Sequence, residues 1–223
     1  MVVYSYGVID LQAAMTVTVP QGTSGSVAVT RFAVSAAEAT LAASKEARYG
    51  RYVHTGAGTY TGLFRRGGLW MSDTPSEQRD HYKFLHQAMN RRARRVLVTG
   101  LGLGMVAAAL LHMDHVEHID IVEIDDDVIA LVEPHYQTLA AQAGKTLTVH
   151  HGDAYTITWP KDFRWDVAWH DVWRDLCTDN LAHMATLHRR YGRRVGWQDS
   201  WSKPLLLAQR AREQRSPAHR LGW

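Results

Sequence analysis

One stretch decides the fold: Val96-Leu97-Val98-Thr99-Gly100-Leu101-Gly102-Leu103-Gly104. Its first half is a short apolar run of the kind that forms a buried strand, and its three glycines allow a sharp turn. The apolar segment 105–113 follows and predicts a helix that begins at the turn. A strand, a glycine turn and a helix in this order are typical of a nucleotide-binding site, because bare backbone and helix N–H groups can approach a ligand closely.

Beyond this stretch, short apolar strands alternate with helices. The strands are expected at 119–123, 147–150, 165–170 and 194–197, and the helices at 126–143, at 179–190 and in the arginine-rich C-terminus. Such alternation predicts right-handed crossovers and a mainly parallel sheet that helices cover on both faces. The expected fold class is therefore α/β, with a doubly wound, mainly parallel sheet over residues 91–223.

Residues 1–90 are expected to form a small N-terminal β/α region. We expect short strands at 17–19 and 27–29 joined by a turn, a helix at 36–47, and a hairpin of strands at 58–64 and 68–71. A helix from Pro75 to about residue 90 follows, with Thr74 and Glu77 at the spacing of a capping box. The chain is thus divided near residue 90.

The composition suits a soluble globular protein. Of the 223 residues, 46% are hydrophobic and 21% charged, and no apolar run approaches the roughly 20 residues that span a bilayer. Cys177 is the single cysteine, and the N-terminus lacks the pattern of a secretory signal. The histidines show no metal-ligand spacing. We therefore expect a cytoplasmic protein with neither a metal nor a membrane partner.

Arginines cluster in three runs, at 91–95, 189–194 and 210–220. Runs of this kind can bind the phosphates of nucleic acids. The formal net charge is only +3, which favours ordinary solvated helix ends and loops. Nucleic acid is therefore an alternative partner but not the favoured one.

A carboxylate stands where a nucleotide site needs one. Glu123 lies at the tip of the second strand, 23 residues after Gly100, where an acid can accept hydrogen bonds from both ribose hydroxyls. The alternative is an ordinary surface acid at a strand end. Met105 occupies the position of the third glycine in the dinucleotide fingerprint, so the pattern favours a different nucleotide.

Three segments resemble the class I S-adenosylmethionine-dependent methyltransferase superfamily and, within it, the spermidine synthase branch: 96–104, 122–129 and 151–154. The resemblance covers about residues 58–175 and implies a Rossmann-like methyltransferase fold that binds S-adenosylmethionine. Asp153 and Ala154 match the turn that holds adenine in that branch, and Tyr82 falls where it has a pocket tyrosine. The nucleotide contacts implied are Gly100, Gly102, Gly104, Glu123, Ile124, Asp153, Ala154 and Tyr82.

Two positions depart from the spermidine synthase branch. Aminopropyl transfer there uses an acid inside the glycine loop to hold a terminal amine, and this position is Leu103. It also uses two aspartates after the fourth strand. Asp171 matches the first, but the second falls on Arg174, and Asp175 is displaced by one. Because a cation would repel a polyamine, these residues favour methyl transfer over polyamine synthesis.

Asp171 is the candidate catalytic residue, as a base or as a group that orients the acceptor. The alternative is a helix N-cap, because a helix is expected soon after it. Trp169 and Trp173 could form an aromatic wall near the reacting methyl group, although such residues more often lie in the core. His170 should point away from Asp171, since neighbours on a strand face opposite sides.

Three functions stay open on this evidence. The first is methyl transfer to an unknown acceptor, the second is aminopropyl transfer with an altered amine site, and the third is a non-catalytic nucleotide- or nucleic-acid-binding protein. The superfamily's final antiparallel hairpin has no counterpart after Trp197, so the sheet is C-terminally shortened. We expect the N-terminal strands or a partner chain, as in a homo-oligomer, to cover its open edge.

Overall fold

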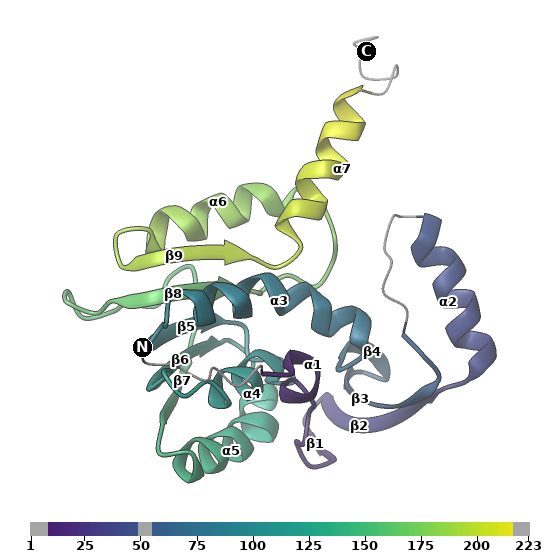
Figure 1. Cartoon of the computed structure of the whole chain (residues 1–223), viewed down its shortest axis with the longest axis horizontal. Coiled ribbons are helices and arrows are strands. Elements are labelled where there is room, and N and C mark those ends of the chain that lie inside the picture. Colours follow the sequence, from purple (N-terminus) through teal and green to yellow (C-terminus); the bar gives the residue numbers. More distant parts are fainter. Residues whose placement is uncertain (1–8, 49–54, 216–223) are drawn as a thin grey trace, which may run out of the picture.

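The computed structural model describes residues 9–48 and 55–215, which form two sheets and their helices (Figure 1). The N-terminal elements are α1 (Leu11–Ala14), β1 (Gly22–Ser24), β2 (Val27–Val34), α2 (Ala36–Arg48), β3 (Gly58–Arg65), β4 (Gly68–Ser72) and α3 (Pro75–Asn90). The later elements are β5 (Arg95–Thr99), α4 (Met105–Leu111), β6 (His118–Glu123), α5 (Asp126–Gln142), β7 (Thr146–His151), β8 (Trp165–His170), α6 (Asn180–Tyr191), β9 (Val195–Ser200) and α7 (Lys203–Arg215).

The later strands form one parallel sheet in the order β7-β6-β5-β8-β9. The chain moves outward from β5 through β6 to β7, then returns to the other side of β5 to form β8 and β9. The strand order therefore reverses between β5 and β8, and a crevice for ligands opens at the carboxyl ends of strands at such a point. The expected α/β class and parallel sheet are confirmed.

Helices cover both faces of the parallel sheet, so it is doubly wound. Val96 and Val98 of β5 pack in the core that contains residues of α3, α4 and α5, whereas Leu97 packs in a second core with residues of α6. On the first face, Phe84 of α3 stacks on Trp169 of β8, with ring centroids 5.3 Å apart. Helix α3 thus packs on the parallel sheet although it precedes the division expected near residue 90.

The N-terminal strands form their own antiparallel sheet in the order β1-β2-β3-β4. The predicted strands at 27–29, 58–64 and 68–71 lie within β2, β3 and β4, and the predicted helix at 36–47 lies within α2. The strand expected at 17–19 is wrong, because Val17 and Val19 bury their side chains in the core without joining a ladder. The Val17 N–H donates to the Asp73 carboxylate at 3.4 Å instead.

The start of α3 differs from the expected capping box. Thr74 is the N-cap residue, but its side chain makes no capping hydrogen bond. Glu77 instead accepts hydrogen bonds from the backbone N–H and the hydroxyl of Ser72, at 2.8 and 2.5 Å. The carboxylate reaches two residues farther back than the motif requires, and so joins the end of β4 to the first turn of α3.

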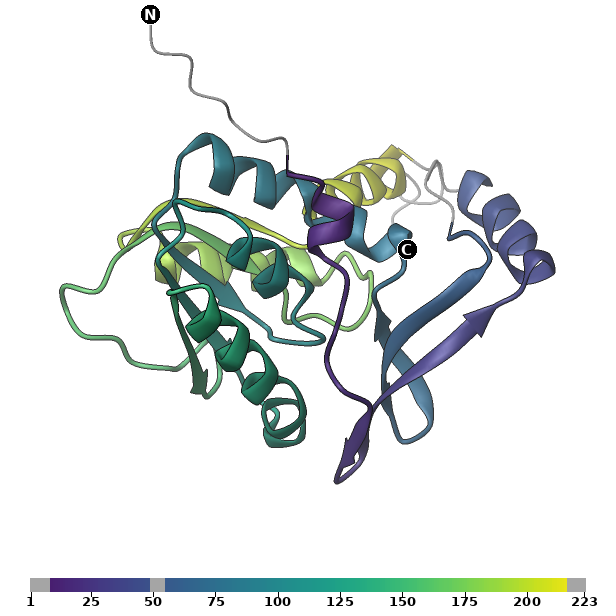
Figure 2. The same cartoon turned by 60° about the horizontal axis from the view of Figure 1, so that its bottom comes forward.

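Two carboxylates join the two sheets, and a third joins segments within the N-terminal region. Asp127 of α5 accepts hydrogen bonds from the Ser24 hydroxyl and the Ser26 N–H in the β1–β2 hairpin, at 2.9 and 3.2 Å. Arg65 at the end of β3 forms a salt bridge with Asp125, the N-cap of α5. Asp73 accepts from the backbone of β3 as well as from the segment after α1. The N-terminal sheet is thereby held beside the carboxyl ends of the parallel strands (Figure 2).

The expectation that N-terminal strands cover the edge of the parallel sheet is wrong. They lie in a separate sheet, and no strand of the described residues pairs with the outer edge of β9. A partner chain at this edge stays a prediction. Within the same ranges, 9–48 and 55–215, no helix is long and apolar enough to cross a membrane.

The first two arginine runs make contacts within the molecule. Arg94 pairs with Glu117 at 2.8 Å, and Arg95 pairs with Asp120 at 3.1 Å. Arg190 donates to a carbonyl of the loop that precedes β8, and Arg194 donates to the Pro160 carbonyl of that loop at 2.7 Å. Because these side chains hold loops against the sheet, a structural role accounts for much of both runs.

Candidate active site

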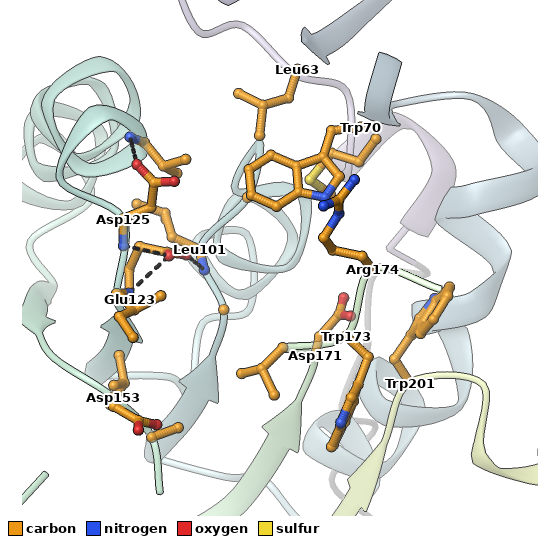
Figure 3. A pocket seen from close by; sticks show the side chains of 18 of the residues that line it. Leu63, Trp70, Leu101, Glu123, Asp125, Asp153, Asp171, Trp173, Arg174 and Trp201 are labelled. Carbon is orange, nitrogen blue, oxygen red and sulfur yellow. Dashed lines mark hydrogen bonds between the residues drawn. The ribbon is translucent and has the colours of Figure 1, made fainter. Parts of the chain in front are cut away.

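A cavity of about 610 Å³ lies between the two sheets, at the carboxyl ends of the parallel strands (Figure 3). Its volume is within the range of small-molecule and cofactor sites. The N-terminal sheet and α3 contribute Leu63, Arg65, Trp70, Met71, Glu77 and His81. The parallel sheet, its loops and the helices α5 and α6 contribute Gly100–Gly102, Val122–Asp125, Val128, Gly152–Tyr155, Asp171–Arg174, His183 and Trp201.

Two of the three loop glycines line this cavity, and sterics require both. Gly100 has a φ of 97°, and a Cβ there would lie 1.9 Å from the backbone oxygen of Asp171. Gly102 has a φ of 49°, and a Cβ there would lie 2.4 Å from the sulfur of Met71 in β4. The loop therefore fits between the end of β8 and the N-terminal sheet only because these side chains are absent.

The last two residues of the glycine run face the core instead of the cavity. Gly104, the N-cap of α4, has a φ of 75°, and a Cβ there would lie 2.0 Å from the Tyr136 ring. Leu103 is fully buried, and its carbonyl accepts a hydrogen bond from the Tyr136 hydroxyl at 3.0 Å. The structure thus does not bring Gly104 to the candidate site, and the Leu103 side chain points away from it.

Glu123 joins β6 to the glycine loop. One carboxylate oxygen accepts from the Leu101 N–H at 2.8 Å, and the other accepts from the N–H groups of Ile124 and Asp125 at 2.8 and 3.0 Å. A carboxylate offers about four acceptor positions, so this one has room for about one more donor. It can accept one ribose hydroxyl directly, and a second only if a backbone contact opens.

The turn after β7 places two further predicted residues at the cavity. Asp153 accepts a hydrogen bond from the Tyr155 N–H at 2.8 Å, which fixes the turn. The Ala154 carbonyl accepts from the Tyr191 hydroxyl of α6 at 2.9 Å. Figure 3 shows Asp153 and Glu123 along one side of the cavity, so the two carboxylates can contact different parts of one ligand. Ile124, also predicted, lines the same side and is 64% exposed.

Asp171 lies across the cavity from Glu123 (Figure 3). Its N–H donates to the Thr99 carbonyl at 2.8 Å, which extends the pairing of β8 with β5 by one residue. The helix-cap alternative is wrong, because α6 begins only at Asn180. Burial, together with the negative charges of Asp80, Glu77 and Glu123, raises the pKa of the Asp171 carboxyl to about 8. The free protein therefore holds a proton there at neutral pH.

Two residues of α3 that the sequence did not single out line the cavity near Asp171. Burial raises the pKa of Glu77 above its ordinary value. Burial also lowers the pKa of His81 to about 4, so its imidazole is neutral, and its Nδ1 is buried without a hydrogen-bond partner. Tyr82, the predicted pocket tyrosine, does not line the cavity and packs against the core instead. Glu77 and His81 are four residues apart and therefore share one face of the helix, which is the pattern that could have identified them from the sequence.

Aromatic side chains form the wall beyond Asp171. Trp70 of β4, Trp173 and Trp201 line the cavity, and Figure 3 shows them on the side opposite Glu123. Trp169 lies in the core, as expected, whereas Trp173 packs against the core and also lines the cavity. His170 points to the other side of β8, where its two ring nitrogens lie 3.1 and 3.0 Å from Thr99 and Gln198.

Comparison with known sequences finds one family, and polyamine aminopropyltransferases are among the relatives. Residues 79–183 match the family model described as the spermine/spermidine synthase domain. A polyamine aminopropyltransferase of Prochlorococcus marinus strain MIT 9313 is 37% identical over 78 residues, and that of strain MIT 9515 is 34% identical over 88 residues. These alignments cover 34% and 38% of this chain but only 27% and 31% of the relatives. The chain thus matches less than a third of each relative.

Comparison with solved structures gives methyltransferases. An S-adenosylhomocysteine-bound methyltransferase of Podospora anserina aligns with a TM-score of 0.36 and 15% identity, over 52% of this chain and 47% of that chain. A putative O-methyltransferase from Klebsiella pneumoniae aligns with a TM-score of 0.34 and 17% identity, over 48% of each chain.

Proposed function

We propose that this chain transfers an alkyl group from an adenosyl sulfonium to a nucleophilic acceptor, because residues 79–183 match the family model of the spermine/spermidine synthase domain. The family uses substrates derived from S-adenosylmethionine. The observation that carries the proposal is the placement of Glu123, Asp153 and Asp171 around one cavity, at the carboxyl ends of three strands of the same parallel sheet.

The residues present fit such a nucleotide. Asp153 and Ala154 would hold the adenine, and Glu123 would accept from the ribose. The sulfonium carbon would then lie beside the Asp171 carboxylate, near the ends of β5 and β8, where the strand order reverses. A cation suits this end of the cavity, because Asp171 has three acidic neighbours.

The sulfonium supplies an activated carbon, so the protein mainly has to align the reactants. The acceptor's lone pair forms the new bond to carbon while the carbon–sulfur bond breaks, and its electrons stay on the sulfur as a neutral thioether. A protonated amine must first lose its proton. Once ionised, the Asp171 carboxylate is the group that takes it, and a base with a pKa near neutral is effective at this task.

Two alkyl groups are candidates. The similarity to the Prochlorococcus aminopropyltransferases supports aminopropyl transfer, with an amine site altered at Leu103 and Arg174. The burial of Leu103 supports methyl transfer, because no acid in the glycine loop can hold the terminal amine of a decarboxylated substrate. We put aminopropyl transfer first, since it also has the support of the matched family.

Thermal denaturation with four ligands tests this proposal. S-adenosylmethionine, its decarboxylated form and S-adenosylhomocysteine should raise the melting temperature, because a ligand that binds only the folded state stabilises it. A larger shift with the decarboxylated form would support aminopropyl transfer, and an equal or smaller shift would support methyl transfer. A shift with NAD alone would show the nucleotide assignment to be wrong.

Two variants locate the nucleotide. Asp153→Ala and Glu123→Ala should each remove most of the ligand-induced shift, because a charge-assisted hydrogen bond contributes roughly 1.5–3 kcal/mol. Glu123 also holds the glycine loop, so Asp153, which makes a single local contact, is the cleaner test. Asp126, the exposed first residue of α5, does not line the cavity, and Asp126→Ala should keep the full shift.

A further inference from the structure

Arg174 differs from the other cation of the cavity in having no acidic partner. Among the described residues that line the cavity, Arg65 and Arg174 are the only arginines or lysines. Arg65 is neutralised by its salt bridge with Asp125. Arg174 is exposed and takes part in no ion pair of the described residues. Its charge is therefore available to a ligand.

Trp70 fixes the position of this guanidinium. The Arg174 Cζ atom lies 5.3 Å from the centroid of the Trp70 ring, and the Arg65 Cζ atom lies 4.6 Å from it. Figure 3 shows the Arg174 side chain extending from the segment after β8 toward Trp70, with Asp171 below it. A guanidinium over an indole is held by a cation–π interaction, which orders it before a ligand arrives.

A carboxylate is the ligand group that suits this arrangement. The planar guanidinium offers paired N–H donors that match the two oxygens of a carboxylate. The acids of the cavity would repel an anion elsewhere, because Glu77, Glu123 and Asp153 line its other walls. An anionic group on a bound molecule thus has one favourable place, beside Arg174.

We propose that Arg174, held by Trp70, binds a carboxylate of a reactant in this cavity. The inference rests on the proposed function and adds a substrate feature to it. The carboxylate has two sources: the amino acid end of an S-adenosylmethionine-type nucleotide, or an acceptor that carries an acid as well as an amine. In either case Arg174 selects the reactant by its anionic end while the acids around Asp171 hold the cationic centre.

Calorimetry with two pairs of probes tests the assignment. The first pair is S-adenosylhomocysteine and its decarboxylated analogue, which differ only in the carboxylate. The second pair is 5-aminopentanoate and 1,5-diaminopentane, titrated into protein saturated with the decarboxylated analogue. Arg174→Gln should weaken binding of one carboxylated probe by about 10- to 100-fold and change the affinity for its decarboxylated or diamine counterpart less than about twofold.

The outcomes separate the two sources and the two proposals. If Arg174→Gln loses affinity only for S-adenosylhomocysteine, the carboxylate that Arg174 binds belongs to the nucleotide. If it loses affinity only for 5-aminopentanoate, the carboxylate belongs to the acceptor. Arg174→Lys keeps the charge without the paired donors and should recover part of the lost affinity. Arg193→Gln is the matched control, because Arg193 is exposed and does not line the cavity.

Unchanged affinity for both carboxylated probes in Arg174→Gln would overturn the Arg174 assignment while leaving the proposed function intact. Failure of both nucleotides to bind the wild-type chain would overturn the proposed function, and the Arg174 assignment with it.

Discussion

Asp171 is the residue whose chemistry most depends on its surroundings. A carboxyl group in water is ionised at neutral pH, but burial raises the pKa of Asp171 to about 8. In the free protein it is therefore mostly protonated at pH 7. A bound cation would favour the ionised form and lower this pKa. The protonation state of Asp171 should thus follow the charge of the ligand.

We predict that S-adenosylmethionine releases a proton on binding at pH 7, up to about one for each site. S-adenosylhomocysteine, whose sulfur is neutral, should release much less. Calorimetric binding enthalpies measured in buffers of different ionisation enthalpy give the number of protons released. Equal proton release with both ligands would contradict the placement of the sulfonium beside Asp171.

The variant Asp171→Asn is the control, because it removes the titrating group and should abolish the difference between the two ligands. It should also change how stability depends on pH. The folded-state pKa of Asp171 exceeds the ordinary aspartate value of 3.8, so the wild-type chain loses stability as the pH rises from about 4 to about 8. The free energy of unfolding of Asp171→Asn relative to the wild type should therefore increase over this pH range. Turnover in the variant should be roughly 10²–10⁴-fold lower than in the wild type.

At the scale of elements, the glycine loop between β5 and α4 serves packing as much as binding. Gly104→Ala should destabilise the chain by more than the roughly 1 kcal/mol of a left-handed backbone alone, because its Cβ would meet the Tyr136 ring. Gly144 also has a positive φ, of 66°, but a Cβ there would have no atom within 4 Å. Gly144→Ala therefore measures the backbone cost without a steric clash. Urea denaturation of Gly104→Ala and Gly144→Ala measures the difference. Equal losses of unfolding free energy in the two variants would show that the Tyr136 ring moves aside without destabilising the chain.

The same loop shows how far the sequence could predict the site. The alternation of strands and helices predicted the parallel sheet, because period and turn residues are local properties of the chain. Gly100 and Glu123 could be placed at the cavity because parallel strands end at one edge. The inward direction of Leu103 could not be predicted, since it depends on Tyr136, which is distant in sequence.

Residues supplied by another element escaped prediction for the same reason. Trp70 lies in the N-terminal hairpin, and only the packing of that hairpin against the parallel sheet brings it to Arg174. Tyr82 was placed at the site by resemblance, but the helical rotation of α3 directs Glu77 and His81 there instead. Asp171 lies at the cavity, as the sequence predicted, but its raised pKa follows from burial and from acidic neighbours on α3 and β6, which the sequence does not place.

At the scale of the whole molecule, the cavity exists because two sheets are held together. Leu63, Trp70 and Met71 come from the N-terminal sheet, and Glu123, Asp153 and Asp171 come from the parallel sheet or its loops. Asp127 joins the two bodies without lining the cavity, through its hydrogen bonds to Ser24 and Ser26. Ligand binding and the docking of the N-terminal sheet should therefore be coupled.

We predict that Asp127→Ala loosens the N-terminal sheet and weakens nucleotide binding from a distance. Removing the acceptor leaves two part-buried donors unpaired, which costs about 1–3 kcal/mol. Hydrogen exchange in residues 22–34 should speed up in the free variant, and S-adenosylhomocysteine should restore most of the protection, because the ligand requires the docked sheet. The neighbouring Asp126, whose side chain is 82% exposed, gives the matched control Asp126→Ala, which should exchange like the wild type. Faster exchange in Asp127→Ala with undiminished affinity would mean that the parallel sheet binds the nucleotide without help from its N-terminal neighbour.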